Sequence, residues 1–310
     1  MAQNPLSPFN QSCWNCSTSL PQGTAADINI SDLLTKDVVI ILSIVCALAS
    51  VIGSFGNSLV LLAVHSNENL RTIPDLFITS LAFSDLSVCA LFMPMSIYYF
   101  VQSVSGETQD ENANLARSFL GHTSMVASAT NMFAVTVDRV IAIRFPFKYV
   151  VVMTTRHALI GIVIVWLISV AFGALYAPNL VPRMYIAFYS ATLLFTIIIM
   201  YIYIFIIAKR QENIIQNIHP GTGTVAEKKV AKTIFTVVGI YALCWVPVLL
   251  LPAIVNPSTK PAQFRKCFPW VQTLLACNSA INPYIYCMRS KKYRTAFGKI
   301  LRIERCIEHH

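Results

Sequence analysis

The acidic residue Asp85 lies in the middle of an apolar segment, SLAFSDLSVC. A carboxylate at mid-membrane depth costs several kcal/mol unless it faces other protein groups, so a function is the first hypothesis for it. Its candidate partners are amides and hydroxyls in other apolar segments: Asn57, Ser128, Asn278, Ser279 and Asn282. Such a set suits a monovalent cation such as Na+, held by Asp85, Ser128, Asn278 and Asn282. It equally suits a carboxyl that titrates, or a neutral carboxyl that only collects hydrogen bonds.

A second ionic group, Asp138-Arg139, stands at the end of another apolar segment. Arg139 can pair with Asp138, extend to lipid head groups, or reach an acid on a different helix. Glu227 precedes Trp245 by about five helical turns, which predicts that it lies near the same rim of the membrane. An ion pair between Arg139 and Glu227 would hold two segments together.

Two prolines interrupt apolar segments, Pro247 in LCWVPVLL and Pro283 in AINPYIY. Each removes an intrahelical hydrogen bond and kinks its helix. A kinked helix can hinge, and the large ring of Trp245, two residues before Pro247, would move with the bend. The alternative is a tryptophan that only packs in the core.

The elements that position these residues are membrane-spanning helices. Of the 310 residues 55% are hydrophobic and 12% charged, against about 25% charged in typical soluble chains. This composition excludes disorder, a coiled coil and a soluble enzyme. A spanning helix needs roughly 20 residues with few charges, and seven segments qualify: 38–64, 76–101, 118–137, 158–176, 184–208, 233–255 and 267–288. We therefore predict an all-α, seven-helix transmembrane domain over 38–288.

The basic residues predict the orientation of this domain. With the N-terminus outside, seventeen lysines and arginines fall on inner segments and six on outer ones, as the positive-inside rule requires. The net charge of +9 therefore lies on the cytoplasmic face, where it meets anionic lipid. Nucleic acid is not needed to explain it. The expected location is the plasma membrane.

The segment 1–37 reads as an outer tail. It lacks the basic and apolar regions of a cleavable signal peptide, and it carries three Asn-x-Ser/Thr acceptors for glycosylation, Asn10, Asn15 and Asn29. At the other end, 289–310 contains an amphipathic stretch that we expect to lie on the inner leaflet as a short helix. Cys306 beyond it is a candidate for palmitoylation.

Together these motifs resemble the rhodopsin-like G-protein-coupled receptors over essentially the whole chain. The matches fall in order: Gly56-Asn57, LAFSD ending at Asp85, Asp138-Arg139-Val140, Trp166, Tyr201, CWVP at 244–247 and NPYIY at 282–286. Within that family, KYVVVMTTRHALIGIVIVW and CNSAINPYIYCMRSKKYRTAF are similar to melanocortin receptors and their lipid, cannabinoid and adenosine relatives. The resemblance implies a receptor that activates a heterotrimeric G protein and has no enzymatic activity.

The resemblance also implies roles for individual residues. The switch would comprise Asp138, Arg139, Glu227, Tyr201, Tyr286, Trp245, Pro247, Asn282 and Pro283. The ligand would contact an apolar, aromatic outer pocket with one cation, formed by Arg117, His122, Met125, Tyr185, Tyr189, Leu249, Phe268 and Gln272. Such a pocket suits an anionic lipid or a small acidic ligand, with a peptide or nucleoside as alternatives. A pairing of Arg117 with nearby acids is equally expected.

Departures from the family pattern narrow the range of ligands that we expect. The acids that melanocortin receptors use for calcium and peptide are replaced by Met95, Asn114 and Ser118, so a melanocortin peptide is not expected. Gly121 stands where amine receptors have an anchoring aspartate. The family's usual outer disulfide cannot form, but three outer cysteines allow one bond, and the family resemblance favours Cys267 with Cys13 or Cys16.

The rival class is a seven-span transporter or channel in which Asp85 relays protons or ions. Such a protein would show an inverted internal repeat or polar residues along several spans, and the sequence shows neither. Nor does it contain a nucleophile-base arrangement, metal-ligand spacing or phosphate-binding glycine loop.

Overall fold

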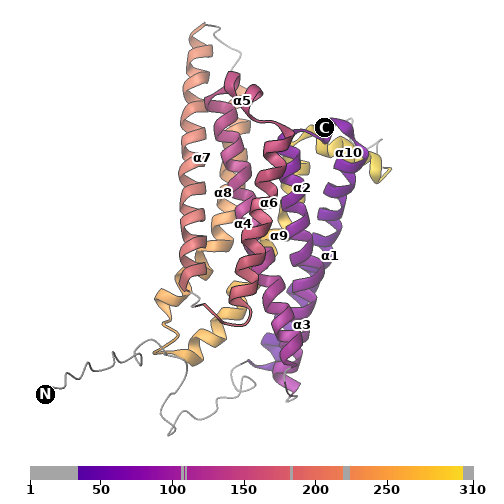
Figure 1. Ribbon diagram of the computed structural model, residues 1–310, viewed down its shortest axis with the longest axis vertical. Helices are drawn as coiled ribbons and strands as arrows, with labels where there is room; N and C mark the ends of the chain where they lie inside the picture. The colour runs from indigo at the N-terminus through magenta and orange to yellow at the C-terminus, as the bar shows by residue number, and fades with distance from the viewer. Residues whose placement is uncertain (1–33, 106–107, 109, 182–183, 219–223, 303–310) are drawn as a thin grey trace, which may run out of the picture.

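The computed structural model describes residues 34–105, 108, 110–181, 184–218 and 224–302, with the backbone alone over most of 211–238. The described chain is a bundle of long, roughly parallel rods (Figure 1). Its helices are α1 (Lys36–Ser66), α2 (Ile73–Ser87), α3 (Met93–Ser105), α4 (Glu111–Arg144), α5 (Pro146–Val152), α6 (Thr155–Tyr176), α7 (Met184–Ile218), α8 (Thr224–Ile254), α9 (Pro261–Arg289) and α10 (Lys291–Ile300). The short elements η3 (Glu68–Leu70) and η4 (Val88–Phe92) complete them.

Each of the seven predicted spans coincides with one rod. The second rod consists of α2, η4 and α3, which follow one another without a break. By length and composition, five rods of the described part can cross a membrane: 36–66, 73–105, 111–144, 155–176 and 185–207. The rod α9 is less apolar because Gln272, Asn278 and Asn282 lie within it. Two of these side chains, Asn278 and Asn282, are buried inside the bundle, so polar groups of α9 lie in the interior and not against lipid.

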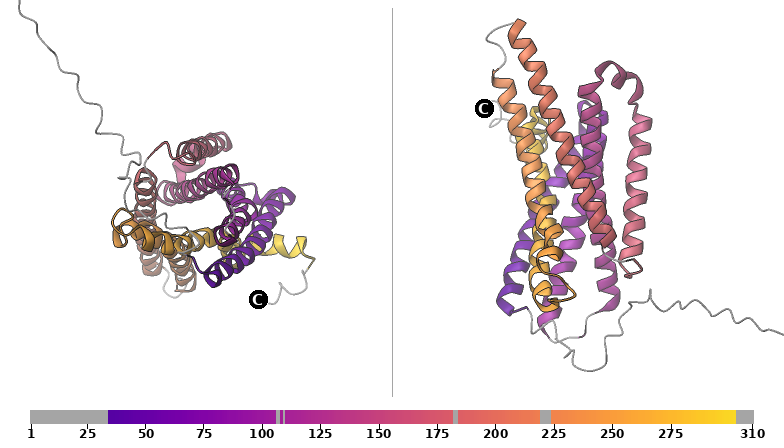
Figure 2. Two further views of the ribbon diagram at one scale, coloured as in Figure 1. Left: turned by 90° about the horizontal axis from the view of Figure 1, so that it is seen from below. Right: turned by 90° about the vertical axis from the view of Figure 1, so that its left-hand side faces the viewer.

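The two ends of the bundle carry different elements. The start of α1 and the end of α6 lie at one end, while α5, α10 and the end of α7 lie at the other (Figure 1). Viewed along the axis, the rods surround a common interior (Figure 2). We call the end with α5 and α10 the inner end, following the predicted orientation.

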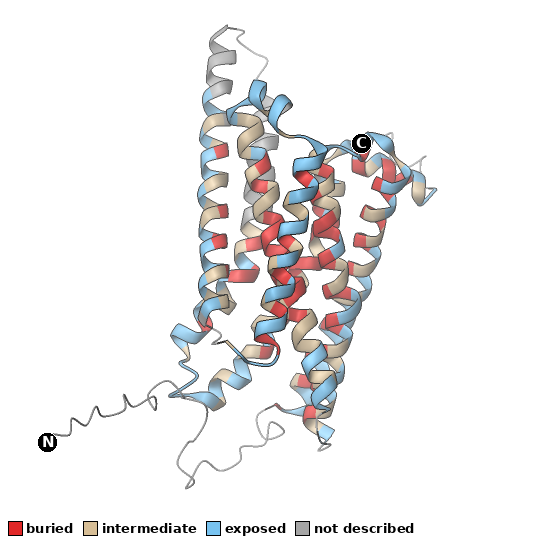
Figure 3. Ribbon diagram, viewed as in Figure 1, coloured by how far each residue is buried: buried red, intermediate tan, exposed pale blue. Residues whose placement is uncertain are grey.

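Burial separates the interior of the bundle from its lipid-facing surface. Buried residues line the middle of the rods, and exposed ones cover the outward faces (Figure 3). Large apolar side chains such as Ile160, Val163 and Leu167 of α6 are about half exposed or more. An apolar exterior around a partly polar interior is the arrangement that lipid surroundings favour.

Capping side chains define where several helices begin. The carboxylate of Asp110 accepts hydrogen bonds from the backbone of Asn112 and Ala113 at the start of α4, at 2.9 and 3.2 Å. At the start of α2, Asp75 accepts from the Thr72 hydroxyl at 2.5 Å. These contacts satisfy amide or hydroxyl donors that the first helical turn leaves open. Each carboxylate thereby stabilises the first turn of its own helix.

The second span contains a feature that hydropathy did not predict. One turn beyond Asp85 the helix widens into the π-type turn η4, and Pro94 follows within α3. Wide turns of this kind commonly occur near functional sites because they re-aim the side chains around them. The predicted prolines Pro247 and Pro283 lie inside α8 and α9, together with Pro252 and Pro269.

The predicted amphipathic helix at the C-terminal end is confirmed. Tyr293, Ala296 and Phe297 of α10 are buried against α1 residues that include Val60 and Ala63. The basic residues Lys291 and Lys292 lie on its exposed side.

Helices α4 and α6 approach each other closely at Gly173. A Cβ atom on Gly173 would overlap the Thr123 hydroxyl and lie 3.1 Å from the carbonyl oxygen of Phe119. At Gly161 of the same helix, a Cβ would lie 3.7 Å from the ring of Phe77, which is ordinary contact. The α4–α6 spacing therefore depends on the absence of a side chain at Gly173.

We expect Gly173→Ala to destabilise the protein by about 1–3 kcal/mol, the usual cost of overpacking a close contact. The matched control, Gly161→Ala, should change stability little. Thermal unfolding in detergent, monitored by thiol-reactive fluorescence, measures both. Adding Thr123→Ala to Gly173→Ala should recover part of the loss, and equal melting temperatures for the two glycine variants would contradict the packing argument.

Candidate functional site

Asp85 is fully buried and joins three rods. The hydroxyl of Ser128 on α4 donates to its Oδ1 atom at 2.8 Å, and Nδ2 of Asn282 on α9 donates to Oδ2 at 2.7 Å. Ser279, one turn before Asn282, also lies within hydrogen-bonding reach of the carboxylate. Both carboxylate oxygens are thus satisfied by groups more than forty residues away in sequence.

The polar group around Asp85 continues to α1 through Asn57. Nδ2 of Asn57 donates to the carbonyl oxygens of Gly53 at 2.9 Å and Ser279 at 3.0 Å. Its Oδ1 atom is buried without a hydrogen-bond partner in the described part of the chain. A buried acceptor without a partner is uncommon and would be satisfied by a bound donor or a cation.

The predicted sodium ligands are therefore brought together only in part. Asp85, Ser128 and Asn282 are in direct contact, whereas Asn278 is buried without a described bond to Asp85. Ser279 takes its place beside the carboxylate. Carboxylate, hydroxyl and amide oxygens are hard ligands that suit a cation such as Na+, so the residues present fit the ion.

A second buried acid, Asp138, lies at the inner end of α4. Nε of Arg139 lies 3.8 Å from its Oδ2 atom, and the hydroxyl of Tyr149 on α5 donates to its Oδ1 atom at 2.7 Å. Burial, followed by the hydrogen bond to Asp138, raises the pKa of the Tyr149 phenol, which therefore remains a donor at neutral pH. The sequence reasoning missed Tyr149, because nothing in the pattern shows that α5 folds back onto α4.

Arg139 has a side chain that is 45% exposed at the inner surface. The structure shows the local pair with Asp138, one of the three partners that the sequence allowed. The side chain of Glu227 lies outside the described residues, so the pair of Arg139 with Glu227 stays a prediction.

Tyr201 and Tyr286 both pack against the buried cluster around Tyr241 and Trp245, which we call the central core. Tyr201 of α7 packs against the central core and lies within hydrogen-bonding reach of Thr136 on α4. Tyr286 of α9 packs against both the central core and the cluster beneath α10, where its ring lies 5.9 Å from that of Tyr293. The two predicted switch tyrosines are thus placed to respond to movements of α7, α9 and α10.

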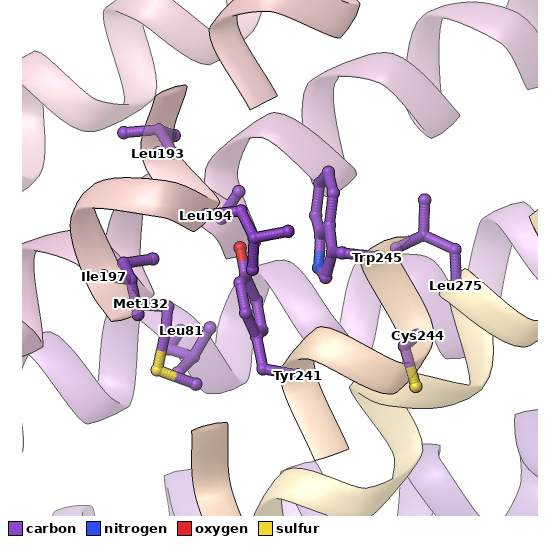
Figure 4. Close-up of a cluster of buried hydrophobic side chains, with 10 residues drawn as sticks. Leu81, Met132, Leu193, Leu194, Ile197, Tyr241, Cys244, Trp245 and Leu275 are labelled. Atoms are coloured by element: carbon purple, nitrogen blue, oxygen red, sulfur yellow. The ribbon is translucent and has the colours of Figure 1, made fainter. Parts of the chain in front are cut away.

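The central core surrounds Trp245. Figure 4 shows its ring and that of Tyr241 near Leu81 of α2 and Leu194 and Ile197 of α7. The two ring centroids are 5.5 Å apart. Nε1 of Trp245 is buried without a hydrogen-bond partner in the described part of the chain. Trp245 is therefore held mainly by packing, which permits it to move with the proline bend at Pro247.

At the outer end, Arg117 is held in a defined position on α4. Its guanidinium donates to Oδ1 of Asn114 at 3.0 and 3.3 Å and lies 4.1 Å from the ring centroid of Tyr99 on α3. Cation–π contacts of this kind and the amide bond orient the guanidinium in advance. The result is a half-buried cation between α3 and α4.

A row of rings leads inward from His122. His122 stacks with Tyr176 at 6.0 Å and Tyr176 stacks with Phe172 at 5.5 Å, while the rings of Phe172 and Tyr189 are tilted to each other at 4.7 Å. The Tyr189 and Thr130 hydroxyls lie 2.8 Å apart. Two of the predicted pocket residues, His122 and Tyr189, are thus joined along the α4–α6–α7 boundary by aromatic residues that the sequence reasoning had not chosen.

The remaining predicted pocket residues differ in their burial. Met125 and Leu249 pack against the central core. Phe268 stacks with Phe264 at 5.5 Å near the start of α9. Gln272 on α9 is half-buried, and Tyr185 at the start of α7 is 57% exposed.

Several predictions fall outside the described residues. These are the glycosylation acceptors Asn10, Asn15 and Asn29, the cysteines Cys13 and Cys16, and Cys306. Cys267 is described and exposed at the outer end of α9. A disulfide from Cys267 to the tail therefore stays a prediction.

Comparison with known proteins identifies the family. The family model for the 7 transmembrane receptor (rhodopsin family) matches residues 56–180 and 178–286. The chain belongs to the rhodopsin family of seven-transmembrane receptors. It is a G-protein-coupled receptor, and the bundle is accordingly a seven-helix, multi-pass membrane domain.

Individual relatives differ in the ligand that their names record. Human melanocortin receptor 3 is 30% identical over 268 residues, covering 81% of this chain and 82% of that receptor. The alpha-1A adrenergic receptor of Oryzias latipes is 26% identical over 325 residues, covering 84% and 67%. The adenosine receptor A2a of Equus caballus is 28% identical over 300 residues, covering 82% and 70%. These receptors establish the class and not the ligand. Nothing in them favours the transporter alternative.

Proposed function

We propose that this receptor lies in the plasma membrane with its N-terminus outside and binds an anionic amphipathic ligand near Arg117. The observation that carries the proposal is the guanidinium held between Asn114 and Tyr99. A positioned guanidinium forms strong paired hydrogen bonds with carboxylate or phosphate groups. The apolar residues Met125 and Leu249 lie deeper in the bundle and suit the ligand's hydrocarbon part.

The inner end would receive the G protein. Seventeen basic residues fall on inner segments against six on outer ones, which supports this orientation by the positive-inside rule. A ligand that binds the active state more tightly would shift the bundle toward it. Movement at Trp245 and Pro247 would then swing α8, and Tyr201 and Tyr286 would turn toward Arg139.

Asp85 would take part by holding Na+ in the resting state. The partner-free Oδ1 of Asn57 and the hydroxyl and amide groups around the carboxylate support this assignment. When bound, the ion supplies a positive charge that offsets the buried carboxylate. Asp85, with Ser128 of α4 and Asn282 of α9, would be the residues that hold it.

The ligand proposal predicts a selective loss in Arg117→Gln. Signalling to a lysophospholipid with a phosphate head group should require about 10- to 100-fold more ligand, since hydrogen bonds to a charged group contribute about 1.5–3 kcal/mol. A neutral monoacylglycerol of the same chain length serves as the comparison in a cAMP and calcium assay. Arg265→Gln, at another outer arginine, is the matched control. Response to nucleosides or short peptides alone, unaffected by Arg117→Gln, would refute the proposal.

We further propose that Arg139 pairs with Glu227 across the bundle, and we call this ion pair the clamp. It predicts that Glu227→Ala raises ligand-independent signalling, because Arg139 would lose that partner. Guanine-nucleotide exchange on purified heterotrimers, at equal receptor density in membranes, measures the basal rate. Glu212→Ala, which removes an acid near the inner end of α7, should leave it unchanged. An unaltered basal rate in well-expressed Glu227→Ala would count against the clamp.

The sodium proposal predicts that NaCl raises the melting temperature of the receptor. At ten times its dissociation constant, a bound ion stabilises the folded state by about 1.4 kcal/mol. Choline chloride at the same ionic strength should have no such effect. Asp85→Asn should abolish the difference between the two salts, and a sodium response that survives this substitution would exclude the site.

A further inference from the structure

One backbone carbonyl in the second rod lacks the donor that a helix normally supplies. In η4 the amide of Met93 donates to the carbonyl of Val88, five residues back. The carbonyl of Cys89 would, in the same pattern, accept from residue 94, but that residue is Pro94, which has no N–H group. Cys89 is fully buried, and an unpaired carbonyl in the hydrocarbon region of a membrane is strongly unfavourable.

A serine of the first rod satisfies this carbonyl. The hydroxyl of Ser50 on α1 donates to the Cys89 carbonyl oxygen at 2.6 Å. Gly53, three residues further along α1, permits the close approach of the two rods, because a Cβ atom there would overlap the Cys89 sulfur. The wide turn is therefore completed by a side chain from another helix.

The η4 turn determines which side chains of α3 face α4. A π-type turn takes up one extra residue, so the residues after it are rotated by about 100° relative to an uninterrupted α-helix. Phe92 and Tyr99, about two turns apart, both contact α4 in this arrangement. The Phe92 ring lies against Gly121, where a Cβ atom would overlap it, and the ring centroid of Tyr99 lies 4.1 Å from Cζ of Arg117. An uninterrupted helix would turn Tyr99 away from Arg117.

We propose that Ser50 is a positioning residue of the outer site: its hydroxyl stabilises the η4 turn and thereby keeps the Tyr99 ring against Arg117. This inference rests on the ligand-binding role of Arg117 under the proposed function. Ser50 acts on the ligand through the backbone of the second rod, since its hydroxyl donates to η4.

Loss of the hydroxyl favours an ordinary α-turn over the wide one. The carbonyl of Cys89 then gains a donor when Met93 transfers its amide from Val88 to Cys89, which is the bond of a regular α-helix. That exchange removes the extra residue from the turn and rotates α3. The guanidinium of Arg117 then loses its aromatic partner.

The decisive variant is Ser50→Ala, which removes one oxygen from α1. We expect a lysophospholipid with a phosphate head group to require up to about tenfold more ligand for half-maximal signalling, the size of shift that loss of one hydrogen bond gives. The response to a neutral monoacylglycerol of the same chain length should change little. Hydrogen exchange of the backbone amides of 88–99, measured in nanodiscs, should become faster.

Two control variants separate the bond to η4 from the loss of a hydroxyl as such. Ser50→Thr keeps a hydroxyl and should restore the lysophospholipid potency and the slow exchange. Ser87→Ala removes a hydroxyl of the second rod that donates to the Phe83 carbonyl at 3.0 Å. That carbonyl lies inside the regular helix α2, where the backbone supplies a donor of its own, so neither readout should change.

Tyr99→Leu removes the ring through which Ser50 is proposed to act. In that background Ser50→Ala should cause no further loss of lysophospholipid potency, because groups that act through one contact are not additive. A full additional loss in the double variant would overturn the proposal.

The outcomes distinguish the role of Ser50 from the ligand site on which it rests. Unchanged hydrogen exchange in Ser50→Ala overturns the role of the hydroxyl in the turn. Faster exchange with unaltered lysophospholipid potency, in an assay where Arg117→Gln has lost potency, overturns the positioning role and leaves the proposed function standing. If Arg117→Gln and Ser50→Ala both leave the potency unchanged, both proposals fail. Equal losses for the phosphate and neutral lipids, with a lower melting temperature, identify a purely structural contact and also overturn the inference.

Discussion

The buried carboxylate of Asp85 is the constraint on which the rest of the bundle depends. An acid in the middle of a membrane must find protein partners, because lipid offers none. Here the partners come from α4 and α9, through Ser128 and Asn282. Asn57 brings α1 to the same place by donating to the Ser279 carbonyl. Four rods are therefore held in register by polar contacts that apolar packing alone cannot specify.

Conformational change in such a bundle has to exchange one set of polar partners for another. Asp138 has Arg139 and Tyr149 close by, and Asp75 has Tyr293 and Thr72. All of these contacts lie at the inner end, where water can replace a lost partner more cheaply than at the level of Asp85. Movement is thus easiest at the inner end, while the centre around Asp85 needs an ion or water to compensate.

The sequence predicted the spans because, in a chain this apolar, about twenty consecutive residues with few charges indicate a membrane-spanning helix. It also predicted Asp85, Ser128, Asn278 and Asn282 as one group, since polar side chains are costly alone in lipid, and of these Ser128 and Asn282 are bonded to Asp85. It did not predict Tyr149 or Tyr293 as partners of acids, because a tyrosine in an amphipathic segment is equally suited to packing. The η4 turn was missed for a similar reason, since hydropathy does not record a change in helical hydrogen bonding.

The similar receptors are named for different ligands, because the residues that build the bundle are different from the residues that bind the ligand. The groups that satisfy the buried carboxylate of Asp85, such as Ser128 and Asn282, meet a requirement of the helix bundle itself, whereas the names of the similar receptors record several different ligands. Under the proposed function, the residues at the outer end are instead selected by the chemistry of the ligand. Arg117, held by Asn114 and Tyr99, lies at the outer end of α4, apart from the polar centre around Asp85. Under the proposed function, ligand selectivity is therefore sought at Arg117 and its neighbours and not at the polar centre.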